Sequence, residues 1–418
     1  MEQEEKRWFL GVDWGSAEHW ARLADAGGRE LGARRFAHSG EGLAQLAQWA
    51  LAVSGGRADQ VWVAIEVPHG PVVESLMERG FRLFSINPKQ ADRFRDRFSP
   101  AGAKDDSRDA EVLSDALRTD ARAFRELKSS PAQILELREW SRMGDELGAD
   151  HTRLTNQLRD QLWRYYPQAL ELARGAIGQD WFLDLLALAP TPAAAQRLRR
   201  DALARLIKRH RLRRIEAAGA LATLRAAAIR LAPGAAEAAS AHVGLIIPRL
   251  RLINRQLRQV RSRLDQITQA IAQEGQASGQ SPGQRDVTVL RSLPGVGRTV
   301  IATLLAEAWE PLQRRDYHAL RCLAGVAPVT RRSGKTVLVI RRRAANQRLA
   351  NALYHWARVA AQRDGVSKAK YAALRSRGCS HARALRGLGD RLLAIACAML
   401  ESQTTFDPNQ AHGTPRAA

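Results

Sequence analysis

The chain has 418 residues, 45% of them hydrophobic, so it is long enough for two or three domains with sizeable cores. The formal net charge of +22 favours a polyanionic partner. The three cysteines lack metal-ligand spacing, the acidic N-terminus does not resemble a signal peptide, and no apolar run approaches the ~20 residues of a membrane span. We therefore expect a reduced, cytoplasmic protein with no membrane partner.

The basic residues are concentrated in the C-terminal third. Residues 1–125 hold 18 Lys/Arg and 20 Asp/Glu, a net charge of −2, whereas residues 285–401 hold 22 and 7, a net charge of +15. Only eight of the 65 basic residues are lysine, and arginine suits bidentate contacts to phosphate and guanine. This distribution predicts nucleic-acid contact by the C-terminal third; a purely solubilising role is the simpler alternative.

The N-terminal part, residues 1–125, alternates between strand and helix patterns. Residues Asp25–Gly28 form a turn signal between the second and third strands, Ser39 can cap the first helix, and Pro88 can open a later one. The expected strands are 7–13, 18–25, 29–37, 60–66 and 81–86, and the expected helices are 40–53, 70–79, one from 88, and 107–117. Three hairpin-joined strands followed by alternating helices and strands predict a ribonuclease-H-like α/β domain.

Residues 126–284 have the pattern of a helical and coiled-coil region. Two long helices are expected, Gln133–Tyr165 and Ile246–Ile271, which could pair with each other or with another subunit. In the second helix, apolar residues alternate at spacings of three and four, as in a heptad seam. This seam comprises Ile247, Leu250, Ile253, Leu257, Val260, Leu264, Ile267 and Ile271.

The remaining segments complete the predicted organisation. Shorter helices are expected over 168–240, and the Gly/Ser/Gln-rich residues 274–284 predict a flexible linker at a domain boundary. A mostly helical C-terminal domain is expected at 285–404, followed by a disordered tail at 405–418.

The strongest chemical signal comes from four acidic residues: Asp13, Glu66, Asp106 and Asp109. Asp13 and Glu66 end apolar, strand-like runs, and the other two share a helix face because they are three residues apart. A lone Asp after a strand is more often a turn residue, so the prediction depends on the whole set. Gathered carboxylates suit hard divalent cations, and in a basic protein they indicate metal-dependent chemistry on a nucleic-acid phosphodiester. Asp105 and Asp115 are competing acids that we place outside the cluster.

The segment Leu293–Gly297 lies between two helical stretches, which is the pattern of a helix-hairpin-helix. Gly295 and Gly297 would let backbone amides approach a phosphate, and Arg298 stands at the start of the next helix. An ordinary glycine turn is the alternative.

Ser333 is predicted to lie in a glycine-bearing loop among cationic side chains. Such surroundings can hold a phosphate beside a hydroxyl nucleophile, although a serine next to glycine is commonly a turn residue. The cations expected to contact nucleic acid near this loop and after the strand-like Val337–Ile340 are Arg331, Arg332, Lys335, Arg341, Arg342 and Arg343.

In this order, the motifs resemble one family, the DEDD-type insertion-sequence transposases, which includes the Piv-type DNA invertases and the bridge-RNA-guided recombinases. The resemblance runs from about residue 8 to residue 402. Its marks are Gly11-Val12-Asp13, Ile65-Glu66, Asn87-Pro88-Lys89-Gln90, the Lys104–Ala110 block, Leu293–Gly297, Ala324–Pro328 with Ser333-Gly334, and Tyr371–Gly378. The segment Lys104-Asp105-Asp106 departs from the usual Lys-Thr-Asp, which leaves the identity of the third acid open.

The resemblance implies a site and a set of partners. The four acids would be the DEDD tetrad of a RuvC-like domain that binds Mg²⁺, with two ions and with Mn²⁺ as a substitute. Ser333 would be the nucleophile of the C-terminal transposase domain, forming a 5′-phosphoserine link and freeing a 3′-hydroxyl. The implied partners are double-stranded DNA (element ends and target), a noncoding guide RNA and further copies of the chain in a dimer or tetramer, in the bacterial cytoplasm at the nucleoid.

Three other functions remain open. A Holliday-junction-type nuclease would use the same tetrad with water as the nucleophile. A sugar-kinase-like or actin-like ATPase would use Gly11–Ser16 as a phosphate-binding hairpin. A non-enzymatic nucleic-acid scaffold would explain the charge and the helices but would leave the acids without a role.

Overall fold

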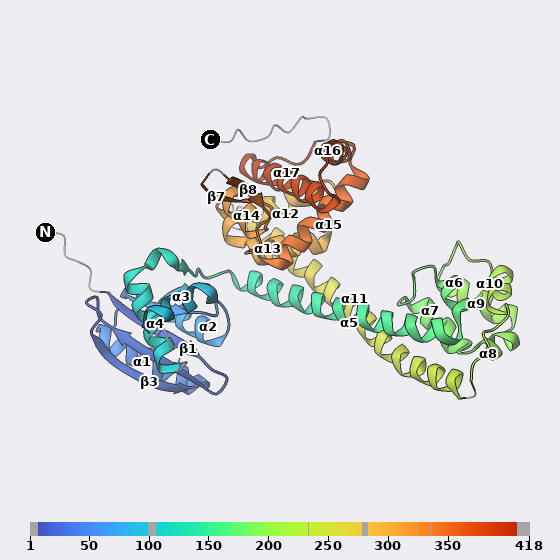
Figure 1. The fold of residues 1–418 in the computed structure, drawn as a ribbon, viewed down its shortest axis with the longest axis horizontal. Helices are drawn as coiled ribbons and strands as arrows, with labels where there is room; N and C mark the ends of the chain where they lie inside the picture. Colours follow the sequence, from blue (N-terminus) through green and yellow to red (C-terminus); the bar gives the residue numbers. More distant parts are fainter. Residues whose placement is uncertain (1–6, 99–105, 233, 278–282, 335, 408–418) are drawn as a thin grey trace. The chain divides into compact units, whose positions relative to one another are not determined.

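The computed structural model describes residues 7–98, 106–232, 234–277, 283–334 and 336–407. The chain forms two compact units, Met1–Ser129 and Ser130–Ala418, each with its own buried cores (Figure 1). The first unit combines a sheet with helices, and the second is almost entirely helical. Within the described residues, no helix is both long and apolar enough to cross a membrane.

The sheet of the first unit confirms the predicted strands to within about one residue at each end. Its strands are β1 (Trp8–Trp14), β2 (Glu18–Ala24), β3 (Glu30–Ala37), β4 (Val61–Ile65), β5 (Arg82–Ser85) and β6 (Arg125–Glu126). They lie in the order β3-β2-β1-β4-β5-β6. Strands β1, β4 and β5 are parallel to one another, while β2, β3 and β6 pair antiparallel with their neighbours. The two-residue strand β6 was not predicted, since it is too short to carry a hydrophobic pattern.

Helices cover both faces of this sheet. They are α1 (Gly40–Ser54), α2 (Pro71–Glu78), α3 (Pro88–Phe98) and α4 (Asp106–Thr119), with short 3-10 turns at Ala58–Gln60 and Ala121–Ala123. The Ser39 hydroxyl accepts a hydrogen bond from the Gly42 amide at 3.0 Å, as expected of the predicted cap. Helices α1 and α2 share a core with one sheet face, and α3 and α4 share a core with the other.

Helix α4 lies directly against the backbone of β1. Alternation along β1 turns Leu10 and Val12 toward α1 and α2, and turns Phe9 and Gly11 toward α4. A Cβ atom at Gly11 would lie 1.9 Å from the carbonyl oxygen of Ala110 and 2.7 Å from the amide of Ser114. Only glycine allows this approach, so Gly11 sets how close α4 comes to the strand that carries Asp13.

The second unit is built around two long helices, α5 and α11, that pair with each other. Its elements are α5 (Ala132–Tyr165), α6 (Pro167–Ala173), α7 (Asp180–Leu188), α8 (Pro192–Arg197), α9 (Arg200–Arg209), α10 (Ala217–Leu224), α11 (Ala235–Ala277), α12 (Gly283–Ser292), α13 (Arg298–Gln313), α14 (Tyr317–Leu323), β7 (Val329–Ser333), β8 (Thr336–Ile340), α15 (Gln347–Arg363), α16 (Gly365–Ser376) and α17 (His381–Ser402). The pairing confirms the intramolecular alternative for the predicted long helices.

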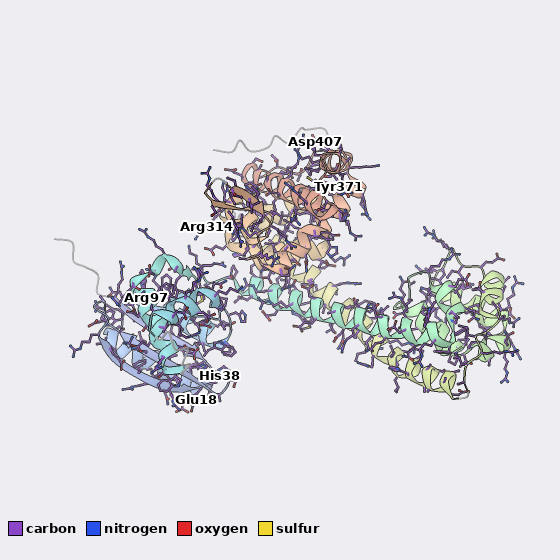
Figure 2. The ribbon with its side chains drawn as sticks, in the orientation of Figure 1. Glu18, His38, Arg97, Arg314, Tyr371 and Asp407 are labelled. Atoms are coloured by element: carbon purple, nitrogen blue, oxygen red, sulfur yellow. The ribbon has the colours of Figure 1, made fainter. Side chains whose placement is uncertain are left out.

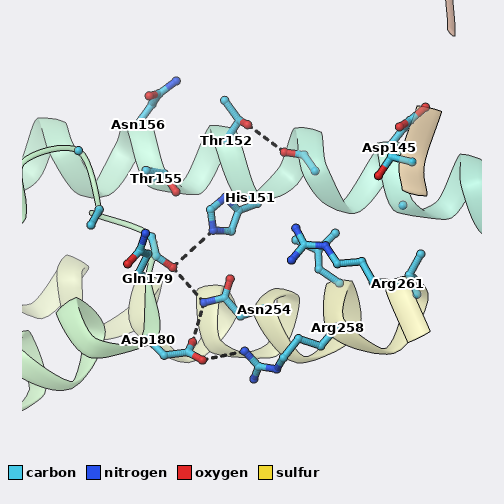
Figure 3. A pocket seen from close by; sticks show the side chains of 18 of the residues that line it. Asp145, His151, Thr152, Thr155, Asn156, Gln179, Asp180, Asn254, Arg258 and Arg261 are labelled. Atoms are coloured by element: carbon cyan, nitrogen blue, oxygen red, sulfur yellow. Dashed lines mark hydrogen bonds and ion pairs between the residues drawn. The ribbon is translucent and has the colours of Figure 1, made fainter. Parts of the chain in front are cut away.

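The predicted heptad seam is buried, but it is divided into two cores. Ile247, Leu250 and Ile253 pack with helices α6 to α10, whereas Val260, Leu264 and Ile267 pack with the C-terminal helices. Between the two cores lies a polar cavity of about 770 Å³ (Figure 3). There, Asn254 donates to the Gly178 carbonyl at 2.9 Å and to Asp180 at 2.7 Å.

The linker prediction for 274–284 was wrong at both ends. Helix α11 continues to Ala277 and α12 begins at Gly283, so only 278–282, which lie outside the described residues, separate the two helices. The apolar seam continues through Ile271 and carries the helix into this polar stretch. The predicted tail lies largely outside the described residues.

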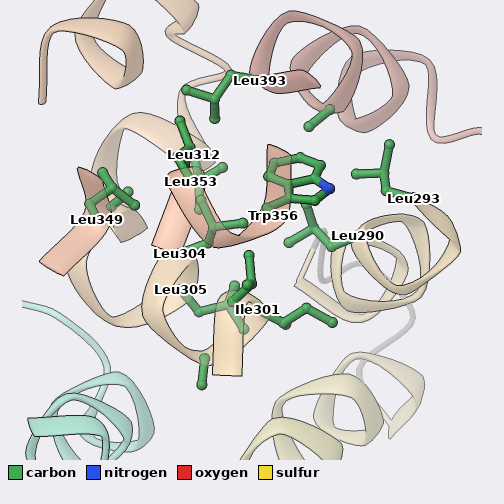
Figure 4. Packing of buried hydrophobic residues seen from close by; sticks show 14 of the residues in the cluster. Leu290, Leu293, Ile301, Leu304, Leu305, Leu312, Leu349, Leu353, Trp356 and Leu393 are labelled. Atoms are coloured by element: carbon green, nitrogen blue, oxygen red, sulfur yellow. The ribbon is translucent and has the colours of Figure 1, made fainter. Parts of the chain in front are cut away.

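Trp356 is the centre of the C-terminal core (Figure 4). It is fully buried among leucines of α12, α13 and α17, and its indole nitrogen donates to the Pro294 carbonyl at 2.9 Å. This bond ties α15 to the turn between α12 and α13, so the arrangement of the helices depends on one aromatic anchor.

Gly11→Ala tests the contact between α4 and β1. The added methyl group would overlap the α4 backbone, so we expect a loss of roughly 1–3 kcal/mol or more in the stability of the first unit. Hydrogen exchange of the β1 and α4 amides in the full chain would measure the loss. Gly40→Ala is the matched control, because nothing lies within 4 Å of that position; equal exchange in the two variants would contradict the proposed contact.

Candidate functional site

Asp13 and Glu66 lie at the carboxyl ends of adjacent parallel strands. Val12 of β1 pairs with Ile65 of β4, so each acid occupies the next position on its own strand. By strand alternation, both side chains belong to the sheet face that α3 and α4 cover. The register of β1 and β4 therefore explains why these two residues are close together.

Asp109 and Glu66 meet at one guanidinium group. Asp109 on α4 is 4% exposed, and its carboxylate accepts a 2.6 Å hydrogen bond from Arg95 of α3. The same side chain lies 3.6 Å from Glu66 and 2.7 Å from Asp92. Burial alone would lower the pKa of Arg95, but the bonds to Asp109 and Asp92 and the nearby Glu66 raise it above the usual arginine value. Arg95 thus stays charged and offsets part of the negative charge of the acidic site.

The fourth acid, Asp106, is the first residue of α4, one turn before Asp109. Its helical position gives the two residues a common face, but its side chain, like all of Lys104 and Asp105, lies outside the described residues. Among the described side chains, no group of three or more His, Cys, Asp or Glu is placed to hold a metal ion.

The chemistry of these residues, as distinct from their placement, suits a hard cation. Asp13, Glu66 and Asp109 supply carboxylate oxygens, the ligands that such ions prefer. Arg95 supplies positive charge at the place where an ion would sit between Glu66 and Asp109. Sequence reasoning missed Arg95, because nothing in the arginine-rich helix 88–98 distinguishes it from Arg93 or Arg97.

A histidine pair, of which one member is buried and the other exposed, lies beside the strand end that carries Asp13. His19 is fully buried, accepts a 3.4 Å hydrogen bond from the Gly15 amide, and lies 2.9 Å from His38, which is labelled in Figure 2. Burial, and then the neighbouring His38, lower the pKa of His19. This pair fixes the turn after Asp13 and was not predicted, since single histidines in strands carry no spacing signal.

Ser333 lies on an exposed β-hairpin and not in a loop, which corrects the sequence prediction. It is the last residue of β7 and pairs with Thr336 of β8 across a turn in which Gly334 has φ +54°. The β-branched residues on both sides of the turn favour strands, which the glycine signal had obscured. Val337, Leu338 and Val339 of β8 are 50%, 56% and 62% exposed.

The cationic residues predicted around this hairpin are at its base and along β7. Arg331 and Arg332 belong to β7, Arg341 to Arg343 follow β8, and Lys335 lies outside the described residues. No carboxylate pairs with these arginines in the described part of the chain. Their charge is therefore available to an external anion.

The glycine turn lies between two helices, α12 and α13, as expected. Gly295 has φ +76°, and a Cβ atom there would lie 2.6 Å from the Ala360 amide of α15, so this glycine has a packing role. Gly297 precedes α13 and is exposed, while the Arg298 guanidinium pairs with Asp265 of α11. A nucleic-acid role for Gly295, Gly297 and Arg298 remains a prediction.

Arg95→Gln should show whether Arg95 and a divalent ion compete for the same carboxylates. Without divalent ions, the variant leaves Asp109 buried and unpaired, so its Tm should fall by several degrees. Mg²⁺ should then raise the Tm more in the variant than in the wild type, because the ion no longer competes with a guanidinium. Arg97→Gln, on an exposed side chain of the same helix, is the control. Equal Mg²⁺ stabilisation of both proteins would show that Arg95 does not compete with the ion.

His19 predicts a pH effect on stability. Its pKa is lowered in the folded chain, so between that value and the ordinary 6.5 the unfolded chain binds more protons than the folded one. The free energy of unfolding should therefore fall as the pH drops below 6.5, and should fall less steeply in His19→Gln. Denaturant titrations from pH 5 to 8 measure this; identical slopes would show that His19 is not the group responsible.

Comparisons with known proteins agree with the motifs. Residues 10–167 match a family model for DEDD transposases of the IS110 type, and residues 287–372 match the model of the transposase IS116/IS110/IS902 family. The chain is 31% identical over 410 residues to the mini-circle putative transposase for IS117 of Streptomyces coelicolor, covering 96% of each protein.

Two further relatives show the same relationship. A putative transposase of Sinorhizobium fredii is 55% identical over 215 residues, a match that spans 51% of this chain and 60% of that protein. An uncharacterized protein of insertion element IS116 from Streptomyces clavuligerus is 28% identical over 98% of each chain. The chain therefore belongs to the IS110/IS116 family of insertion-element transposases.

Proposed function

We propose that this transposase is a recombinase that breaks and rejoins DNA strands through a covalent serine intermediate. The observation that carries the proposal is that Asp13 and Glu66 follow paired positions of adjacent parallel strands and that Arg95 links Glu66 to Asp109. Ser333 lies on an exposed, arginine-rich hairpin of the other unit. Asp106 would complete the tetrad from the first turn of α4.

Each residue has a definable task. The carboxylates of Asp13, Glu66, Asp106 and Asp109 would hold Mg²⁺, and Arg95 would withdraw as the ions enter. Two bound ions would lower the pKa of a coordinated oxygen and neutralise charge on the attacked phosphate, with Mn²⁺ able to substitute. The cations beside Ser333 would hold the nonbridging oxygens of that phosphate.

The covalent step exchanges one phosphoester for another. The Ser333 oxygen attacks phosphorus, the bond from phosphorus to the 3′ oxygen breaks, and the serine proton ends on the leaving oxygen. The products are a 5′-phosphoserine link and a free 3′-hydroxyl, which can attack a second such link and release the serine. No cofactor is consumed, because the energy of the broken bond is kept in the new one.

The partners in the proposal are those that the family resemblance implies, and the charge and exposure of the chain are compatible with them. A net charge of +15 over residues 285–401 suits double-stranded DNA at the element ends and the target, and also a noncoding guide RNA from the element. The exposed apolar strand Val337–Val339 suits contact with another copy of the chain in a dimer or tetramer. The serine and the tetrad would then come from different subunits.

The competing function is a metal-dependent junction nuclease that uses water. It shares the tetrad and leaves Ser333 as a turn residue. Strand cuts without protein attached to the DNA would favour it.

Ser333→Ala should abolish the covalent protein–DNA adduct while leaving DNA affinity within about twofold, because a hydroxyl adds no phosphate charge contact. The measurement is a denaturing gel of the full chain with labelled DNA that carries the element ends. Ser376→Ala removes an exposed hydroxyl of the same unit, which donates to the Ala373 carbonyl, and should leave the adduct intact. Asp13→Asn should abolish both cuts and adducts. Wild-type adduct levels in Ser333→Ala would refute the proposed nucleophile.

A further inference from the structure

The base of the β7–β8 hairpin contains a cavity of about 650 Å³. It lies at the end of the hairpin remote from Ser333, where Val329 pairs with Ile340. Its lining is Val329, Arg331, Ile340, Arg341, Arg342, Arg343 and Ala344. The apolar members give the cavity a floor, and no acidic residue lines it.

Two arginines of α17 extend this set of charges. The charges of Arg341 and Arg383 act on Arg386, whose pKa is lowered by burial first and then by these two neighbours. Arg342 has its Nε atom buried without a hydrogen-bond partner in the described structure. We call Arg331, Arg341, Arg342, Arg343, Arg383 and Arg386 the hairpin-base arginines. Such a gathering of like charges is unfavourable by itself and is relieved by an anion.

Within the described residues, several arginines of the helical core have carboxylate partners. Arg315 pairs with Asp286 at 2.7 Å, Arg321 with Asp390 at 2.5 Å, and Arg348 with Glu307 at 2.6 Å. The described residues provide no such partner for Arg341, Arg342, Arg383 or Arg386. Because no acid lines the cavity, an external anion would offset this local positive charge.

We propose that the hairpin-base arginines bind one backbone phosphate of the DNA strand that Ser333 attacks, and that the hairpin fixes the distance between the two phosphates. The phosphate site stands on its own observations; its place on the cleaved strand rests on the proposed function. A phosphodiester suits several guanidinium groups because each presents paired N–H donors to its oxygens. The cavity has room for a phosphate group, and its apolar members Val329, Ile340 and Ala344 suit the adjoining sugar.

The strand geometry gives the spacing. Four residue steps separate Val329 from Ser333, which at about 3.3 Å per residue is ~13 Å. The serine would thus be placed ~13 Å from the phosphate that the arginines hold, and this distance would select which phosphate of the strand it reaches.

The binding test uses the full chain and a labelled DNA duplex of about 30 base pairs, since phosphate contacts do not depend on sequence. Arg386→Gln and Arg383→Gln should each weaken DNA binding about tenfold and reduce the slope of log affinity against log salt by about one. Arg363→Gln changes the same charge on an exposed side chain at the end of α15 and should stay within twofold. Equal loss in all three variants would reduce the effect to overall charge and overturn the proposal.

The effect of phosphate on the Tm distinguishes an arginine that binds an anion from one that has only a packing role. Because the hairpin-base arginines repel one another, Arg386→Gln should keep the Tm or raise it, and inorganic phosphate should raise the Tm of the wild type more than that of the variant. A lower Tm with unchanged phosphate response would assign Arg386 a packing role and overturn the site. A single-stranded RNA of the same length is the second arm: if the variants weaken RNA binding but not DNA binding, the DNA assignment is wrong.

The spacing has its own test. A neutral methylphosphonate is moved one position at a time along the strand of an element-end duplex, and the yield of covalent adduct is measured. The loss should be greatest at one position at a fixed distance from the cut, and this maximum should disappear in Arg386→Gln; an equal loss at every position would overturn the spacing. If no adduct forms in any sample, the proposed recombinase chemistry fails, while the affinity, salt and phosphate measurements still decide the arginine site.

Discussion

The candidate site depends on the contact between the α4 backbone and β1 at Gly11. Side chains normally separate the backbone of a helix from that of a sheet, whereas here the Ala110 carbonyl occupies the space that a Cβ would need. That approach brings Asp109, the residue before Ala110, down to the strand ends where Asp13 and Glu66 lie. A buried carboxylate at that depth requires a compensating cation, and Arg95 of α3 provides it. The positions of α3 and α4 therefore follow from one glycine and one ion pair.

Each unit contains a local excess of one charge, which is negative in the first unit and positive in the second. The first unit has a carboxylate cluster with an arginine between its members, and the second has arginines at the hairpin base without carboxylates. Among the described residues, several partly buried arginines have a carboxylate partner, as Arg315 has in Asp286, and the hairpin base differs from these. Metal-dependent chemistry on a phosphodiester would offset both excesses, since divalent ions satisfy carboxylates and DNA phosphates satisfy arginines.

Much of the fold could be predicted from sequence because its signals are local. Strand alternation, the Ser39 cap and the heptad spacing of the second long helix each reflect contacts within a few residues. The polar cavity beside His151 and Asn254 was missed, because the seam of α11 looks continuous and the interruption comes from the α5 side, at Gly144 and Gly148. The linker was misplaced for a related reason, since composition does not show how far a helix already packed at Ile271 will continue.

The candidate site also contains some residues that could be predicted from the sequence and others that could not. Asp13 and Glu66 could be predicted because the ends of parallel strands meet at one sheet edge. Arg95 could not, because its selection among the arginines of α3 depends on the direction of that helix over α4. Ser333 was found through a family motif and not through its surroundings, which are strands and exposed arginines with no general base in the described part of the hairpin. A hydroxyl so placed has no base beside it, and Arg95 holds the carboxylates of Glu66 and Asp109. On the proposed function, neither unit would cut DNA by itself, and cleavage would begin only when nucleic acid and a partner subunit bring Ser333 to the carboxylates.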